Sequence, residues 1–204
     1  IIPSVIAENQ LELDQLFSKY SGLFKELHLD LVDGRFANNQ SLQFNFKLSS
    51  KFTYNAHLMI KNPETWIKKH GSKVDLCIVQ ASEIKDISVF ISWMKKLGKR
   101  VALALKPEEK VGLIKPYLKK INHLLILTVN PGFYGSTYLK KPLSKIKEIK
   151  KIDPKIKIIV DGGMNPSTIG DAVQSGADIV IVGSYLAKAK DVKKALREVK
   201  RALD

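Results

Sequence analysis

The sequence predicts an α/β protein of the (β/α)₈ TIM-barrel class, and three observations predict the barrel. Short apolar segments rich in β-branched residues alternate with amphipathic segments from one end of the chain to the other. Eight such apolar segments occur at a repeat of roughly 25 residues, which favours parallel strands joined by right-handed crossovers. No linker or low-complexity tract interrupts the 204 residues, so we expect one domain over residues 1–204.

The eight predicted strands are the short apolar segments. They are expected at residues 1–7, 26–32, 54–60, 75–81, 100–105, 123–129, 157–161 and 177–183. A closed barrel is favoured over an open, doubly wound sheet, because each intervening segment is only long enough for one crossover.

The helices between the strands are predicted from apolar residues at positions i, i+3 and i+4. These patterns cover residues 10–20, 87–98, 109–120, 139–152, 166–176 and 190–203. Gly98 and Gly176 mark helix ends, while Pro63 and Pro166 stand where helices should begin. Residues 41–51 carry the weakest helical pattern of the chain.

Composition excludes several classes of protein. With 45% hydrophobic and 26% charged residues, the chain has the profile of a soluble globular domain. No apolar run approaches the roughly 18 residues of a membrane span, so we expect no membrane association and a cytoplasmic location. Cys77 is the only cysteine, which excludes an intramolecular disulfide and a multi-cysteine metal site, and we interpret it as a core residue.

The charge of the chain is strongly positive. Thirty-four Lys and Arg residues against 20 Asp and Glu give a formal net charge of +14, as in some proteins that bind nucleic acids. The lysines, however, are spread through amphipathic segments at the spacing of solvated helix faces. No aromatic and basic platform accompanies them, so we expect no nucleic-acid partner. The sequence does not decide whether the chain forms a homo-oligomer.

Unexpected polar residues fall near the carboxyl ends of predicted strands, where barrel enzymes place their chemistry. His28 and Asp30 lie two residues apart on one strand and therefore point to the same side. His57 lies on the next strand, and Asp161 ends the seventh. Two imidazoles and two carboxylates at one rim suit one divalent cation, with Zn²⁺ first and Fe²⁺, Mn²⁺ or Co²⁺ as alternatives.

Each of these residues alone has a plainer interpretation. A lone buried histidine is more often a hydrogen-bonded core residue than a ligand, and Asp33 with Gly34 is typical of a turn. Four ligand-type residues on one predicted rim, in contrast, favour a metal or catalytic site.

A second group of residues is rich in glycine and predicts a phosphate site. Loops after the late strands of such barrels commonly bind phosphate, because glycine lets several backbone N–H groups approach one anion. The group comprises Gly132, Gly135, Gly162, Gly163 and Gly183, with the N–H of Ser184 at a helix start. Each turn alone is equally consistent with plain turn chemistry.

Six segments occur in the order and approximate spacing found in one known family: "PSVIA", "LHLDLVDGRF", "AHLMIKNPE", "LTVNPGFYGS", "IIVDGGMNPSTI" and "GADIVIVGSYL". Over residues 2–187 the chain resembles the ribulose-phosphate 3-epimerase family. That resemblance implies a (β/α)₈ barrel of the ribulose-phosphate-binding type. It also implies an enzyme of the pentose phosphate pathway that inverts carbon 3 of D-ribulose 5-phosphate, giving D-xylulose 5-phosphate.

The resemblance also implies roles for individual residues. The metal ligands would be His28, Asp30, His57 and Asp161, with Asp30 and Asp161 also acting as the acid/base pair. The phosphorylated ketose would be bound by Ser4, His57, Met59, Gly132, Phe133, Tyr134, Gly135, Gly162, Gly163, Gly183 and Ser184.

Several positions depart from the usual pattern of that family, and two of them, Val32 and Leu127, stand where methionine is usual. Gln80 and Ser82 stand where His and Glu are usual, and Lys106 stands where Asn is usual. Tyr134 places a ring in the phosphate loop, where family members usually have no side chain. We expect these positions to bear on the substrate and its phosphate, and the metal and proton chemistry to be retained.

Three alternatives follow. The same chemistry acting on a hexulose phosphate such as D-allulose 6-phosphate is the first, and a non-catalytic or moonlighting phosphosugar-binding barrel is the second. The third is a barrel decarboxylase of the orotidylate type. It is disfavoured because such enzymes use Asp-x-Lys-x-x-Asp on a strand, and the segment "DLVD" contains no lysine.

Overall fold

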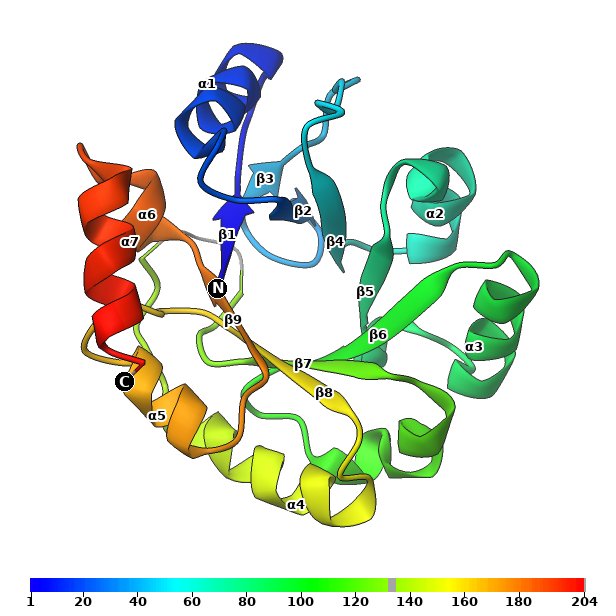
Figure 1. The fold of residues 1–204 in the computed structure, drawn as a ribbon. Coiled ribbons are helices and arrows are strands. Elements are labelled where there is room, and N and C mark those ends of the chain that lie inside the picture. The colour runs from blue at the N-terminus through cyan, green and yellow to red at the C-terminus, as the bar shows by residue number, and fades with distance from the viewer. Residues whose placement is uncertain (132–134, 204) are drawn as a thin grey trace.

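Eight parallel strands form a closed ring with the helices outside it in a computed structural model that describes residues 1–131 and 135–203 (Figure 1). Around the ring the strands are β1 (Ile2–Val5), β2 (Glu26–Asp33), β4 (Thr53–Met59), β5 (Leu76–Gln80), β6 (Arg100–Leu105), β7 (His123–Leu127), β8 (Lys157–Asp161) and β9 (Ile179–Val182). Because β1 pairs with both β2 and β9, the ring closes. The predicted (β/α)₈ class is confirmed.

The helices cover the outside of this ring (Figure 1). They are α1 (Gln10–Tyr20), α2 (Pro63–His70), α3 (Ile87–Lys96), α4 (Ser144–Ile152), α5 (Ile169–Gln174), α6 (Ser184–Ala187) and α7 (Val192–Arg201). Short 3₁₀ segments supplement them: η1 (Gly71–Lys73), η2 (Ala81–Glu83), η3 (Val111–Leu113), η4 (Lys115–Lys120) and η5 (Lys141–Leu143). None of the helices in the described part of the chain is both long enough and apolar enough to cross a membrane.

Helix boundaries agree with the sequence signals at several points. Asn9, Asp86 and Asp191 cap α1, α3 and α7, each accepting a backbone N–H of the first turn. Pro63 is the first residue of α2, as predicted. The helix expected to begin at Pro166 instead begins at Ile169, because the Thr168 hydroxyl accepts the N–H of Asn165 and holds a turn before it.

Two other helix predictions were wrong. Residues 109–120 form the 3₁₀ segments η3 and η4 in place of one α-helix, since Pro116 has no N–H to donate within that stretch. Residues 41–51 contain no helix. They begin instead in β3 (Gln40–Ser41), which pairs antiparallel with the end of β2, and Leu42 follows with a φ of 54°.

Alternation along the strands separates two cores. Outward-facing residues pack under the helices, and Cys77 is one of them. Burial raises the pKa of its thiol to about 11, as befits a core residue. Inward-facing residues fill the barrel: Ile2, Leu76, Ile78, Ala102, Ala104, Leu125, Leu127, Ile159 and Ile181. On β2 and β4 the alternating inward positions instead hold buried polar residues, including His28, Asp30 and His57.

Candidate active site

Strand register brings the four predicted metal ligands together. Asp30 on β2 and His57 on β4 are direct neighbours in the parallel ladder, and His28 shares the face of Asp30. Asp161 ends β8 and reaches the same point across β1 and β9, which the closure of the ring makes possible. One ligand atom from each of the four residues lies within 4.8 Å of all the others.

The distances within this cluster fit a small divalent cation. His28 Nε2 lies 3.4 Å from Asp30 Oδ1 and 3.9 Å from Asp161 Oδ2. His57 Nδ1 lies 3.3 Å from Asp30 Oδ1 and 3.6 Å from Asp161 Oδ2. Ligands at about 2.0–2.1 Å from a tetrahedral metal are separated by about 3.4 Å, close to these values.

The same atoms lack ordinary hydrogen-bonding partners. Both imidazoles are 0% exposed, and among the described residues no hydrogen bond reaches His28 Nε2, His57 Nδ1 or Asp30 Oδ1. Leaving a buried polar atom unpaired costs about 1–3 kcal/mol. Three such atoms that converge on one point are therefore expected to share a ligand, and nitrogen and carboxylate donors suit a divalent cation.

The electrostatics of the cluster favour positive charge at its centre. Burial alone would raise the pKa of Asp30, but the charge of the neighbouring His28 and His57 rings holds this pKa well below its usual range. Burial alone would lower the pKa of His57, yet its contacts with Asp161 and Asp30 raise it to about 9. Asp30 is thus ionised, the form required of both a metal ligand and a base.

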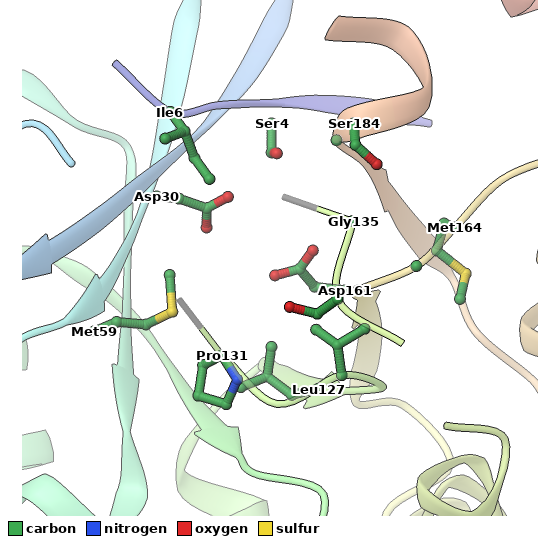
Figure 2. Close-up of a pocket in the computed structure, with 15 residues that line it drawn as sticks. Ser4, Ile6, Asp30, Met59, Leu127, Pro131, Gly135, Asp161, Met164 and Ser184 are labelled. Carbon is green, nitrogen blue, oxygen red and sulfur yellow. The ribbon is translucent and has the colours of Figure 1, made fainter. Parts of the chain in front are cut away.

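A cavity opens above the cluster, and most of the predicted substrate-binding residues line it (Figure 2). Those residues are Ser4, Met59, Gly135, Gly162, Gly163, Gly183 and Ser184, and the cavity is also lined by Asp30 and Asp161 of the cluster. His28 and His57 are not among the described residues that line it, so the two carboxylates are the members of the cluster that face the cavity. Gly132, Phe133 and Tyr134 lie outside the described residues.

The cavity wall also includes residues that the sequence did not single out. They are Ile6, Val129, Pro131, Ser136 and Met164, whereas Leu127, which also lines the cavity, is one of the two positions where the family usually has methionine. Ile6 could have been found, because it follows Ser4 by two positions and so continues the inward face of β1. The others follow β7 or β8 and show no distinctive pattern.

Glycine is required at the turn after β8. Gly162 and Gly163 have φ angles of 112° and 69°, in the region that glycine adopts freely. A Cβ on Gly162 would lie 2.6 Å from the Val129 side chain, and one on Gly163 would lie 2.9 Å from Tyr138 Cβ. The loops after β7 and β8 can therefore pack closely beside the cavity only because both residues lack a side chain.

A lysine lies beside the part of the cavity wall formed by Gly135, Gly163, Gly183 and Ser184, which we call the glycine end. Lys188 Nζ is 3.8 Å from the position that a Cβ on Gly135 would occupy. Lys188 also lines a neighbouring groove with Lys190 and Lys194, and this groove shares Gly135 and other wall residues with the cavity. The glycine end therefore carries positive side-chain charge as well as backbone amides.

Three positions that depart from the family pattern, Gln80, Ser82 and Lys106, lie in different surroundings. Gln80 is fully buried and contacts His57. Lys106 Nζ lies 3.8 Å from the Glu109 carboxylate and 5.0 Å from the centre of the Phe36 ring. Neither Lys106 nor Ser82 is among the described residues lining the cavity.

Comparisons with known sequences agree on one family. A profile of the ribulose-phosphate 3 epimerase family matches residues 1–187. The ribulose-phosphate 3-epimerase of Aquifex aeolicus is 27% identical, with 98% of this chain and 95% of that protein aligned. The ribulose-phosphate 3-epimerase of Bacillus subtilis is 30% identical, with 85% of each chain aligned.

Comparison with solved structures supports the fold. The 3-hexulose-6-phosphate synthase of Salmonella typhimurium gives a TM-score of 0.68 at 16% identity, covering 98% of this chain and 96% of that one. The orotidine 5'-monophosphate decarboxylase of Sulfolobus solfataricus gives 0.66 at 15% identity, covering 99% and 96%. At such identities the likeness concerns the barrel alone.

Proposed function

This chain belongs to the ribulose-phosphate 3-epimerase family, and from that premise we propose that it inverts carbon 3 of D-ribulose 5-phosphate to give D-xylulose 5-phosphate. The observation that carries the proposal is the pair Asp30 and Asp161. These carboxylates face one cavity from different strands, above two buried imidazoles.

The stereochemistry of the reaction requires such a pair. Removing the C3 proton leaves a planar enediolate, and a single base that returned the proton to the same face would invert nothing. Asp30 comes from β2 and Asp161 from β8, with β1 and β9 between them. In Figure 2 the two carboxylates approach the cavity from different sides, as proton transfer on both faces of a flat intermediate requires.

The cluster of His28, Asp30, His57 and Asp161 would hold one divalent cation, with Zn²⁺ first and Fe²⁺, Mn²⁺ or Co²⁺ as alternatives. When bound, the cation supplies a Lewis acid that stabilises negative charge on the C2 and C3 oxygens of the substrate. The two carboxylates accept and donate the C3 proton. Apolar wall residues such as Met59 and Leu127 exclude water from the intermediate.

We place the phosphate of the substrate at the glycine end of the cavity. This end is lined by Gly135, Gly163, Gly183 and Ser184. Because glycine has no side chain and that of serine is small, backbone N–H groups can approach an anion here. The ammonium group of Lys188 beside Gly135 adds a positive charge. The proposed contacts of Gly132, Phe133 and Tyr134 stay predictions.

The direct test of this function is proton exchange at carbon 3. The chain, incubated with D-ribulose 5-phosphate in D₂O, is expected to incorporate deuterium at C3 and form D-xylulose 5-phosphate, both measured by NMR. A chelator should stop both processes, and D-allulose 6-phosphate in a parallel sample tests the hexulose alternative. Absence of cation-dependent exchange with either sugar would contradict the epimerase proposal and favour a non-catalytic barrel.

The Lys188→Gln variant tests where the phosphate binds. Losing one charge-assisted contact at an exposed lysine should raise KM for the sugar phosphate about three- to tenfold, with kcat within about twofold. Lys193→Gln is the matched control, since Lys193 is exposed on α7 and is not among the described residues of the cavity or groove. Steady-state kinetics measure both; equal KM values in the two variants would remove Lys188 from the phosphate site.

A further inference from the structure

Gln80 makes a close polar contact behind one of the proposed metal ligands. Gln80 is the last residue of β5 and is 0% exposed. Its Nε2 lies 2.7 Å from Nε2 of His57, the ring nitrogen opposite the one that faces Asp30 and Asp161. Its Oε1 is buried and has no hydrogen-bonding partner in the described part of the chain.

Hydrogen-bond donors and acceptors decide which atom of the Gln80 amide must face His57. An imidazole that binds a metal through Nδ1 has its lone pair there, so its proton is on Nε2, which becomes a donor. An amide NH₂ group is a donor as well, and two donors cannot form a hydrogen bond at 2.7 Å. Half a turn of the amide exchanges Oε1 and Nε2 with almost no change of shape and brings the unpartnered Oε1 to His57.

We infer, on the basis of the metal site proposed above, that Gln80 is the positioning residue of His57. Its Oε1 accepts the Nε2–H, which keeps the Nδ1 lone pair directed at Asp30 and Asp161. A doubly protonated ring carries the same Nε2–H, so one amide orientation serves His57 before and after a cation binds. Gln80, which departs from the usual residue of the family, thereby fixes the direction of a metal ligand through a hydrogen bond.

The test compares cation affinity in two variants of the full chain. Gln80→Met keeps the length of the side chain but removes the acceptor, and Zn²⁺ or Co²⁺ affinity should fall about 10- to 100-fold. Gln80→Glu keeps an acceptor and should bind the cation at least as tightly as the unmodified chain. Competition with a chromophoric chelator measures all three affinities without any need for turnover.

The tautomer of His57 gives a second, independent readout. In the zinc-loaded unmodified chain, ¹⁵N NMR of the ring is expected to show Nε2 protonated and protected from solvent exchange, and Gln80→Met should lose that protection. Ser41→Ala is the control: Ser41 is buried and its hydroxyl accepts the N–H of Ala7, so its loss weakens the fold without touching His57. Its cation affinity should be unchanged.

The outcomes separate the two proposals. If the unmodified chain binds neither Zn²⁺ nor Co²⁺, both the metal site and the role of Gln80 are overturned. If it binds them and Gln80→Met binds equally well, only the role of Gln80 is overturned. Should Gln80→Met fail to fold, the ring spectrum of the zinc-loaded unmodified chain decides. An Nε2–H that is protected from solvent exchange supports the inference, and an Nε2 that is unprotonated or exchanges freely refutes it.

Discussion

Replacing Asp161 by asparagine is expected to reduce the epimerisation of D-ribulose 5-phosphate by at least about 10³-fold, and Asp30→Asn should do the same. Both carboxylates face the cavity, and each stands on a different side of the position assigned to the substrate. Asparagine has nearly the same shape and keeps one ligand oxygen, but it neither accepts nor donates the C3 proton. A loss of activity in these variants therefore reports the loss of proton transfer and not a change in the shape of the site.

The two variants should differ from each other in deuterium exchange. With one carboxylate left, the C3 proton of only one of the two epimers can still be removed and returned to the same face. One variant is thus expected to incorporate deuterium into D-ribulose 5-phosphate without inversion, and the other into D-xylulose 5-phosphate. NMR of each sugar in D₂O, with the cation at saturating concentration, measures this pattern.

Asp33→Asn is the matched control for this pair. Asp33 ends the same strand as Asp30, yet its Oδ1 accepts the N–H groups of Arg35 and Phe36 and its Oδ2 accepts that of Lys61. It is absent from the four-residue cluster and caps a turn, as the sequence predicted. Its activity should stay within about threefold of the unmodified chain. Full activity in either Asp30→Asn or Asp161→Asn would remove that carboxylate from the mechanism.

Much of the site follows from the period of a β-strand. His28 and Asp30 share a face because side chains alternate, and a parallel neighbour in register places His57 beside Asp30. Asp161 needed one further step, since only the closed ring brings β8 near β2. The prediction of a barrel was therefore what connected the late Asp161 to the early His28 and Asp30.

Other features depend on distances that no strand period encodes. The contact of Gln80 with His57 requires the actual offset between β5 and β4 and the direction of an amide side chain. Lys188 caps the end of α6 and lies beside Gly135 of the loop after β7, a contact between two segments far apart in the sequence. The local pattern also failed at residues 109–120. The apolar spacing there predicts an α-helix, but Pro116 prevents its regular hydrogen bonding and 3₁₀ segments form instead.

Removal of divalent cations is expected to lower the Tm of the protein by about 5–10 °C and to stop C3 exchange. A cation at about 100 times its Kd stabilises the folded state by about 2.7 kcal/mol, and each kcal/mol corresponds to about 2–4 °C for a chain of this size. The gain arises because His28 Nε2, His57 Nδ1 and Asp30 Oδ1 have no other hydrogen-bonding partner among the described residues. Thermal unfolding with and without a chelator measures the shift.

Two histidine variants show whether this shift belongs to the proposed site. His57→Gln removes a ligand nitrogen and should make Tm insensitive to the chelator. His123→Gln changes a histidine at the opposite, amino end of β7, where the ring lies 3.3 Å from Arg100, and should keep the full shift. Restoring exchange with Zn²⁺, Fe²⁺, Mn²⁺ or Co²⁺ in turn then ranks the cations by activity. His57→Gln removes one of the two imidazoles of the cluster. If the chelator still lowered the Tm of this variant by the full amount, the stabilising cation would bind elsewhere in the molecule.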